Sequence, residues 1–190
     1  MADPPTSIDV VLEEYRQMWS YYHRTLDERK NLLDWYFKTV ELPAVAVGFS
    51  VAKDTGALAL PNNVGGTILS VVFLIGVTIH GTYAKESANA AKYQTSMKAI
   101  RAFVKLKYPE LCTAIVIDEQ RETKSGGHRL GSIRAWRGFM IGFANAAIGT
   151  ASLVLLFGWD SWCLQAVWFV LLAAAHLALY NNLYKSYEGD

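Results

Sequence analysis

The sequence predicts an all-α, polytopic membrane protein with four transmembrane helices, the first of them the shortest, and with further helices in the cytosol. Four apolar segments are the first observation, and they agree with a hydrophobic residue share of 52% and a mean hydropathy of +0.16. The second observation is the stretch 84–137, which lies between the second and third segments and holds eleven Lys or Arg against five Asp or Glu. By the positive-inside rule we expect this stretch and both chain termini in the cytosol, in a multi-pass protein of the cell inner membrane.

The N-terminal cytosolic region, residues 1–37, starts without the basic and apolar pattern of a signal peptide, so we expect no cleavage. Residues 8–37 have helical spacing, with Val11, Tyr15 and Met18 on one stripe. The region carries a net charge of −3, whereas residues 84–137 carry +6. Opposite charges favour packing of this helix on the central region of its own or a neighbouring subunit; the alternative is two solvated faces without specific contact.

Residues 38–83 are predicted to form the first transmembrane hairpin. The apolar core 42–52 is too short to span a bilayer alone and has to be extended backwards past Lys38 and Glu41. Residues 53–63 have a turn composition and are expected to form a short outer loop. The second segment, 64–83, is about one membrane thickness long and ends just before a cytosolic lysine.

The central cytosolic region, residues 84–137, is predicted to begin with a helix over 85–107 that continues inward from the second segment and ends before Pro109. One face of this helix is expected to be apolar, formed by Ala88, Ala91, Met97, Ile100, Phe103, Val104 and Leu106, and another basic, formed by Lys98, Arg101 and Lys105. The run 112–117 fits a short strand or a buried helical turn equally well. Residues 125–131 predict a flexible, basic loop.

The second transmembrane hairpin is predicted over residues 138–184, followed by a cytosolic tail, 185–190. Segments 138–159 and 162–184 lack Asp, Glu, Lys and Arg, and only two residues separate them at a tight outer turn flanked by Trp159 and Trp162. In this topology Cys112 and Cys163 lie on opposite sides of the membrane, so we expect no disulfide between them.

Two sets of residues within the apolar segments are candidates for a functional role. Small residues recur at every fourth position of the third segment, which places Gly138, Gly142, Ala146 and Thr150 on one helix face. This face fits packing against a neighbouring helix of the same chain, or an interface between subunits. Polar side chains form the second set, as pore or bundle-interior candidates: Glu41, His80, Asn145 and His176. We expect His80 and His176 at a similar depth and Asn145 deeper, in interhelical hydrogen bonds or lining a pore.

The basic region supplies candidate ligand-binding residues, namely Lys98, Arg101, Lys105, His128, Arg129 and Arg134. Beside Gly126 and Gly127, whose backbones an anion can approach closely, they fit the phosphate group of a nucleotide signal or, alternatively, anionic lipid headgroups. The glycine pattern matches neither a P-loop nor a dinucleotide fingerprint. No metal-binding spacing, catalytic elbow or paired carboxylate motif occurs, so we expect no metal, no cofactor and no enzyme activity, and nucleic-acid binding is not indicated.

The layout of a charged N-terminal helix, the aromatic entry Trp35-Tyr36-Phe37, closely spaced membrane helices and a basic cytosolic helix resembles small bacterial membrane effectors of nucleotide-linked defence systems, the SLATT-type effectors. Four segments rather than a single hairpin depart from the simplest members. The resemblance implies a homo-oligomer in the lipid bilayer that depolarises the inner membrane, in antiphage defence, when a cytosolic signal arrives. That signal is a nucleotide or a partner protein. A non-conducting membrane scaffold that binds cytosolic partners is the alternative; a transporter is disfavoured because no inverted repeat is visible.

Overall fold

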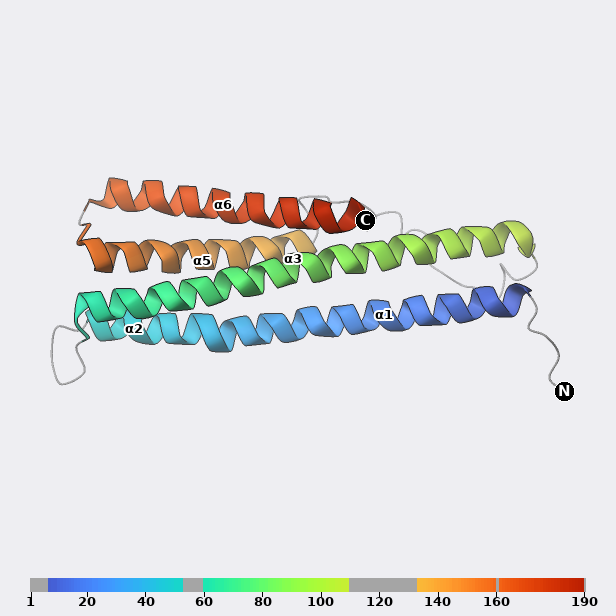
Figure 1. Cartoon of the computed structure of the whole chain (residues 1–190), viewed down its shortest axis with the longest axis horizontal. Coiled ribbons are helices and arrows are strands. Elements are labelled where there is room, and N and C mark those ends of the chain that lie inside the picture. Colours follow the sequence, from blue (N-terminus) through green and yellow to red (C-terminus); the bar gives the residue numbers. More distant parts are fainter. Residues whose placement is uncertain (1–6, 53–59, 110–132, 160, 190) are drawn as a thin grey trace.

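Helices make up almost all of the part of the chain that the computed structural model describes, which is residues 7–52, 60–109, 133–159 and 161–189 (Figure 1). No strand occurs within these ranges. The elements in chain order are α1 (Ser7–Tyr36), a π-helical segment η1 (Phe37–Glu41), α2 (Leu42–Ala52), α3 (Asn62–Lys107), α5 (Ile133–Phe157) and α6 (Trp162–Gly189).

Two long antiparallel rods organise the molecule. One rod is formed by α1, η1 and α2, which follow one another without a break, and the other is α3, whose 46 residues extend over about 69 Å. The shorter helices α5 and α6 lie beside the first part of α3, along α2, η1 and the end of α1 (Figure 1). Towards its C-terminal end α3 pairs with α1, and we call this pair, residues 8–29 and 83–107, the stalk.

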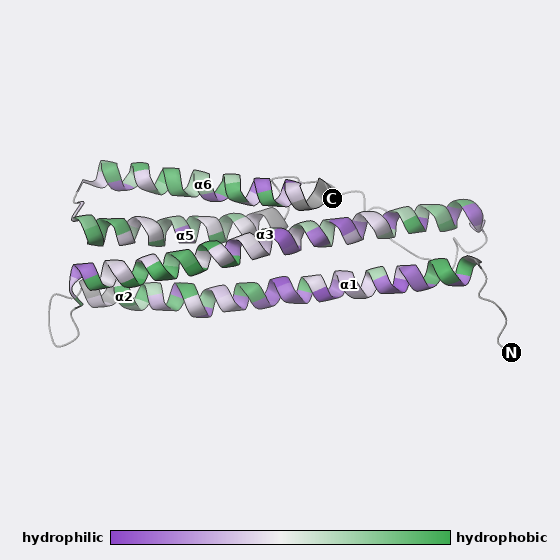
Figure 2. Ribbon diagram, in the orientation of Figure 1, coloured by the Kyte–Doolittle hydropathy of each residue, from purple (hydrophilic) through white to green (hydrophobic). Residues whose placement is uncertain are grey.

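The distribution of hydrophobic and hydrophilic residues divides the molecule into the same two parts. Hydrophobic residues concentrate in α5, α6 and the first half of α3, whereas hydrophilic residues are frequent along α1 and the second half of α3 (Figure 2). Three helices are long and apolar enough to cross a membrane: α3, the part of α5 from Trp136 to Phe157, and the part of α6 from Trp162 to Ser186. The chain is therefore a membrane protein by the length and composition of its helices. With 11 residues, α2 is too short to span a bilayer alone, as the sequence indicates.

The stalk is an antiparallel pair held by tyrosine hydroxyls. Arg101 donates from Nε to the hydroxyl of Tyr15 at 2.9 Å, and Gln94 donates to the hydroxyl of Tyr22 at 2.8 Å. Since 15 and 101 have the same sum as 22 and 94, both contacts belong to one antiparallel register. The predicted packing of the N-terminal helix on the central helix of its own chain is confirmed. The described contacts across the pair include hydroxyl hydrogen bonds and ring contacts, beside buried apolar residues such as Ala90, Met97 and Val104.

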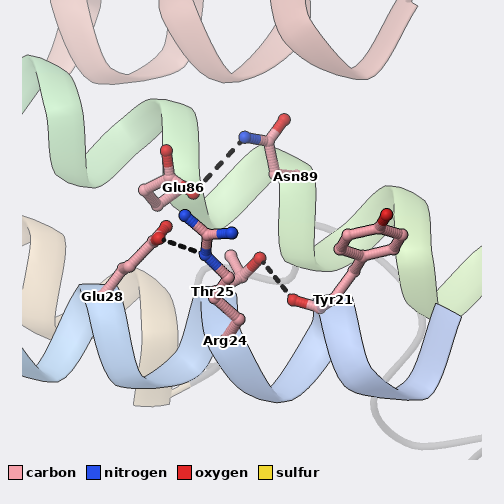
Figure 3. A network of polar contacts seen from close by, with 6 residues as sticks. All are labelled: Tyr21, Arg24, Thr25, Glu28, Glu86 and Asn89. Atoms are coloured by element: carbon pink, nitrogen blue, oxygen red, sulfur yellow. Dashed lines mark hydrogen bonds and ion pairs between the residues drawn. The ribbon is translucent and has the colours of Figure 1, made fainter. Parts of the chain in front are cut away.

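Polar contacts around Thr25, near the base of the stalk, stay within single helices (Figure 3). Thr25 donates to the carbonyl of Tyr21 at 2.9 Å, and Arg24 pairs with Glu28 at 2.9 Å along the exposed side of α1. Exposed intrahelical pairs of this kind contribute little, because water and salt screen them. They support α1 itself rather than its contact with α3.

The predicted apolar face of the central helix is partly wrong. Phe103 and Leu106 are 48% and 87% exposed, while Arg101, predicted on another face, contacts α1. The reason is the coiled-coil spacing of three and four residues: it selects a single stripe of α3 for the partner, composed of Tyr83, Ser87, Ala90, Gln94, Met97, Arg101 and Val104. Phe103 and Leu106 fall outside this stripe.

Tyr36 is the last residue of α1 and lies where this helix enters the apolar half of the molecule. Tyr36 is 1% exposed, whereas its neighbours Trp35 and Phe37 are 65% and 52% exposed, so the aromatic entry divides into one inward and two outward rings. The π-helical segment follows at once, with the amide of Leu42 donating to the carbonyl of Phe37. π-Helical turns are rare and frequent at functional sites.

Several predicted boundaries shift by a few residues or disappear. The helix predicted over 85–107 is confirmed as the second half of α3, which runs unbroken through the division at 83–84 and ends at Lys107. At the other hairpin, α5 starts at Ile133 and α6 extends to Gly189. The turn between them contains Gly158, whose φ of +64° is accessible mainly to glycine. The predictions for 112–117 and 125–131 lie outside the described residues.

Candidate functional site

Buried polar groups follow one side of α3 through the apolar half, and we call them the polar column. They occur at four levels, which we name after a residue of each: the serine level (Ser70, Ser152), the asparagine level (Asn145, Tyr36), the histidine level (His80, His176) and the arginine level (Arg29, Tyr83). From Gly66, at the serine level, to Tyr83, the column extends over about 25 Å along α3. That length is close to the thickness of the hydrocarbon core, about 30 Å.

The asparagine level joins α1 to α5. Asn145 is fully buried, and the hydroxyl of Tyr36 lies 3.1 Å from its Oδ1 and 3.4 Å from the carbonyl oxygen of Ile141. Nδ2 of Asn145 is buried without a hydrogen-bond partner. Gly76 of α3 provides the space for this amide, because a Cβ at that position would lie 2.0 Å from Oδ1.

The histidine level joins α3 to α6. His80 and His176 are 2% and 4% exposed, and their Nδ1 atoms are 3.0 Å apart. A hydrogen bond at this distance requires that one Nδ1 carries a hydrogen and the other accepts it. Nε2 of His80 is buried without a hydrogen bond; the backbone of Gly138 lies close by, outside hydrogen-bond geometry. The ring of Tyr180 stacks on His80 with 5.7 Å between the ring centroids.

The serine level is fully paired. Ser152 of α5 donates to the carbonyl of Gly66 in α3 at 2.9 Å, and the hydroxyls of Ser70 and Ser152 are 2.6 Å apart. Phe73 lies between this level and the histidines, and its ring meets the His176 ring edge-on with 5.8 Å between the centroids. The Phe73 ring also packs closely on Gly149, where an added Cβ would lie 2.9 Å from Cδ2 of Phe73. The column is therefore interrupted by an aromatic side chain on its outer side.

The arginine level lies at the base of the stalk. Arg29 is only 5% exposed; its Nη2 donates to the hydroxyl of Tyr83 at 3.0 Å, and its guanidinium carbon lies 5.1 Å from the Tyr83 ring centroid. Nε of Arg29 is buried without a hydrogen bond. Among the described residues, the ion pairs lie elsewhere, between Arg16 and Glu13 and between Arg24 and Glu28.

Of the four polar candidates from the sequence, the structure brings two into direct contact. His80 and His176 share the histidine level, in agreement with the similar depth predicted for them, and Asn145 occupies the next level. Glu41 is half-buried in η1, apart from the described hydrogen bonds of the column. Sequence reasoning did not single out Tyr36 or Arg29 for the site.

The small-residue face of α5 packs inside the chain. A Cβ on Gly138 would lie 2.7 Å from the ring of Tyr180, and one on Gly142 would lie 3.2 Å from Cβ of His176. Ala146 is fully buried, and Thr150 donates to the carbonyl of Ala146 at 2.8 Å. The face thus contacts α6 and α3 of the same chain, the first of the two alternatives above.

Three of the basic candidates, Lys98, Arg101 and Lys105, belong to the second half of α3. Lys98 and Arg101 are half-buried on the stalk and Lys105 is exposed, while Arg134 belongs to the first turn of α5. His128 and Arg129 lie outside the described residues. Within the described ranges, no group of three or more His, Cys, Asp or Glu residues is placed to hold a metal ion.

Comparisons with protein-family models, with curated proteins and with solved structures found no match.

Proposed function

We propose that the chain is a multi-pass effector of the inner membrane which, as a homo-oligomer, opens an ion-permeable path when a cytosolic signal reaches its stalk. The proposal is supported chiefly by the polar column, because polar side chains in an apolar bundle are costly and usually serve a pathway or a relay. In this proposal η1 and α2 form a first, short crossing beside the three longer helices. Both termini and the basic region then lie in the cytosol.

Helix continuity supports transmission of a signal from stalk to column. α3 contributes Arg101 and Gln94 to the stalk and His80 to the column, without a break in the helix. α1 contributes Tyr15 and Tyr22 to the stalk and ends at Tyr36, the partner of Asn145. A displacement of α1 along α3 would therefore move the Tyr36 hydroxyl relative to the Asn145 amide.

The resting state in this proposal is closed. Asn145 and His80 are 0% and 2% exposed, and the described residues at these levels fill the interior with their own side chains. Opening requires a signal that binds the open arrangement more tightly than the closed one, with about 1.4 kcal/mol for each tenfold shift. A nucleotide or a partner protein that engages the stalk or the basic region would provide this difference. In this proposal the chain has the role of the SLATT-type effectors in antiphage defence.

A non-conducting scaffold is the second candidate function, and one observation favours it. Asn145 bonds to Tyr36, and His80 to His176, within one chain, so the polar groups also serve as ordinary interhelical bonds of a stable bundle. A scaffold needs no polar interior, and loss of the column would leave its interactions with partners unchanged.

Membrane potential in bacterial cells during induced expression separates the two functions. We compare the wild type with Arg101→Ala, which removes a stalk contact and so stands in for the signal, using a potential-sensitive dye. We expect depolarisation that increases in Arg101→Ala and is lost when His80→Phe and Asn145→Ala are added.

The matched control is a Thr78→Val, Thr82→Val double variant, which removes two exposed hydroxyls of the same helix that bond only within their own turns. Added to Arg101→Ala, it should depolarise as Arg101→Ala alone does. A stable potential in both the wild type and Arg101→Ala, with normal membrane insertion, would overturn the pore and favour the scaffold.

A further inference from the structure

We propose that the ion conducted along the polar column is the proton, passed through the His80–His176 pair. This inference rests on the proposed function and specifies its permeant species. The chemistry of the lining is the first argument. The asparagine and histidine levels offer one phenol, one amide and two imidazoles, and imidazole both accepts and donates protons near neutral pH. Alkali cations instead require several oxygen ligands in place of their water, such as rings of carbonyls.

The geometry of the histidine pair is the second argument. With 3.0 Å between the Nδ1 atoms, one hydrogen lies between the rings. A proton that binds the free Nε2 of one ring allows the shared hydrogen to cross to the other Nδ1, whose ring then releases its own Nε2 hydrogen. One proton enters and one leaves, and the two rings remain neutral in exchanged tautomers. A reorientation of the two rings then restores the starting tautomers, because the reverse transfer would carry the proton back.

Two of the column's three buried unpaired atoms mark where the hydrogen-bond chain is broken, the third being Nε of Arg29. Nε2 of His80 and Nδ2 of Asn145 are both buried without a partner. Their levels are one helical turn apart, because the amide packs on Gly76 and His80 is four residues further along α3, about 6 Å. A water molecule between them would accept a hydrogen bond from the amide and contact the ring, as buried waters do at unsatisfied polar groups. The Tyr36 hydroxyl, on the stalk helix, borders the same level and would control entry of that water.

Phe73 provides the outer barrier. Its ring covers the outer side of His176 and separates the histidines from the serine level. A side chain without hydrogen-bonding groups interrupts proton transfer, so water has to pass this ring for conduction to be complete. Phe73→Ala is therefore expected to increase the proton flux.

The test uses the purified full-length chain in lipid vesicles that contain a pH-sensitive dye. One arm imposes a potassium gradient with valinomycin and records the proton flux; the other omits valinomycin and records potassium efflux directly. We expect a proton flux in Arg101→Ala and in Phe73→Ala, with potassium efflux at the level of empty vesicles. Adding His80→Phe should lower the proton flux by about 10²-fold, the range typical of losing a positioned proton-transfer group. Thr78→Val is the matched control and should leave the flux unchanged.

The outcomes separate this inference from the proposed function. Potassium efflux equal to or above the proton flux, unaffected by His80→Phe, would overturn the proton assignment and leave the pore in place. No flux of either ion from Arg101→Ala and Phe73→Ala would overturn the pore itself. Because Phe73→Ala raises the flux whereas His80→Phe lowers it, a general loss of folding does not mimic the expected result.

Discussion

Gly76→Ala is expected to break the contact between the stalk helix and the polar column. The new Cβ would lie 2.0 Å from Oδ1 of Asn145, whereas ordinary contact begins at 3.4 Å, so the amide has to shift by about 1.4 Å. The Tyr36 hydroxyl now lies 3.1 Å from the same oxygen, and a shift of that size ends the hydrogen bond.

The expected loss in the free energy of unfolding is about 2–3 kcal/mol. Overpacking costs about 1–3 kcal/mol, and losing the hydrogen bond between the Tyr36 hydroxyl and Asn145 costs about 0.5–1.5 kcal/mol, since the hydroxyl keeps the carbonyl oxygen of Ile141 as an acceptor. The gain in helix propensity from Gly to Ala, about 1 kcal/mol, offsets part of this loss. For a chain of 190 residues, the apparent Tm should fall by about 5–10 °C.

The assay is thermal unfolding of the detergent-solubilised protein at one scan rate. Gly81→Ala is the matched control in the same helix, because a Cβ there would meet only Cδ1 of Leu183, at 3.5 Å, and its Tm should stay unchanged or rise. Asn145→Ala removes the amide oxygen, so Gly76→Ala in that background should cost nothing, with a coupling energy of about 2 kcal/mol or more. Equal effects of Gly76→Ala in both backgrounds, or a Tm like that of Gly81→Ala, would refute the steric reasoning.

Three further predictions concern topology, the arginine level and the stalk. Cys163, exposed at the start of α6, should react with a membrane-impermeant maleimide added outside intact cells, and reaction only from the cytosolic side would reverse the topology. Arg29→Met should change the unfolding free energy by less than about 1 kcal/mol, whereas Tyr83→Phe should lower it more, because it leaves a buried guanidinium without its acceptor; the reverse order in thermal unfolding would contradict this. Tyr22→Phe should lower the Tm by an amount equivalent to about 1 kcal/mol, since Gln94 loses its described acceptor, and an unchanged Tm would show that this layer adds no stability.

The long helices could be predicted because their signals are local. Helical spacing over residues 85–107 and a proline at 109 were sufficient for the second half of α3, which ends at Lys107. The helix over 8–37 was equally clear, and it ends at Tyr36. The π-helical segment that follows has no sequence signal of its own, because it depends on how Tyr36 and Val40 pack against the other helices.

The face of a helix that meets its partner was harder to predict. Counting apolar residues favoured Phe103 and Leu106, yet α1 contacts the stripe that contains Arg101, where a guanidinium meets a tyrosine ring and hydroxyl. A pattern that sorts residues only into apolar and polar underestimates such pairs, because it counts both the arginine and the tyrosine as polar or surface residues. For the same reason, the sequence pattern gives no sign that Arg29 is buried against Tyr83.

Part of the candidate site could be predicted, because some of its residues are of types that rarely occur in apolar segments. A histidine or asparagine within an apolar segment is conspicuous, and the similar depth of His80 and His176 followed from their positions near segment ends. Their direct contact depends on which face α6 turns towards α3, and no local pattern sets this. Tyr36 went unmarked because tyrosine is ordinary at a membrane boundary, where its ring is apolar and its hydroxyl polar.

The stalk has the energetics that a switch requires. Tyr15, Tyr22 and Arg29 recur every seven residues along α1, so hydrogen bonds recur in its contact with α3, between buried apolar residues such as Met97 and Val104. Each hydrogen bond contributes about 0.5–1.5 kcal/mol, or somewhat more where a guanidinium donates, which is less than a fully buried aliphatic layer provides. A ligand with a few kcal/mol of preference for a displaced α1 is therefore sufficient to shift the stalk. The fully paired serine level, farthest from the stalk, would meanwhile hold α3 against α5. Displacement would then be larger at Tyr36 than at Ser152, which places the moving part of the column next to the unpaired atoms of Asn145 and His80.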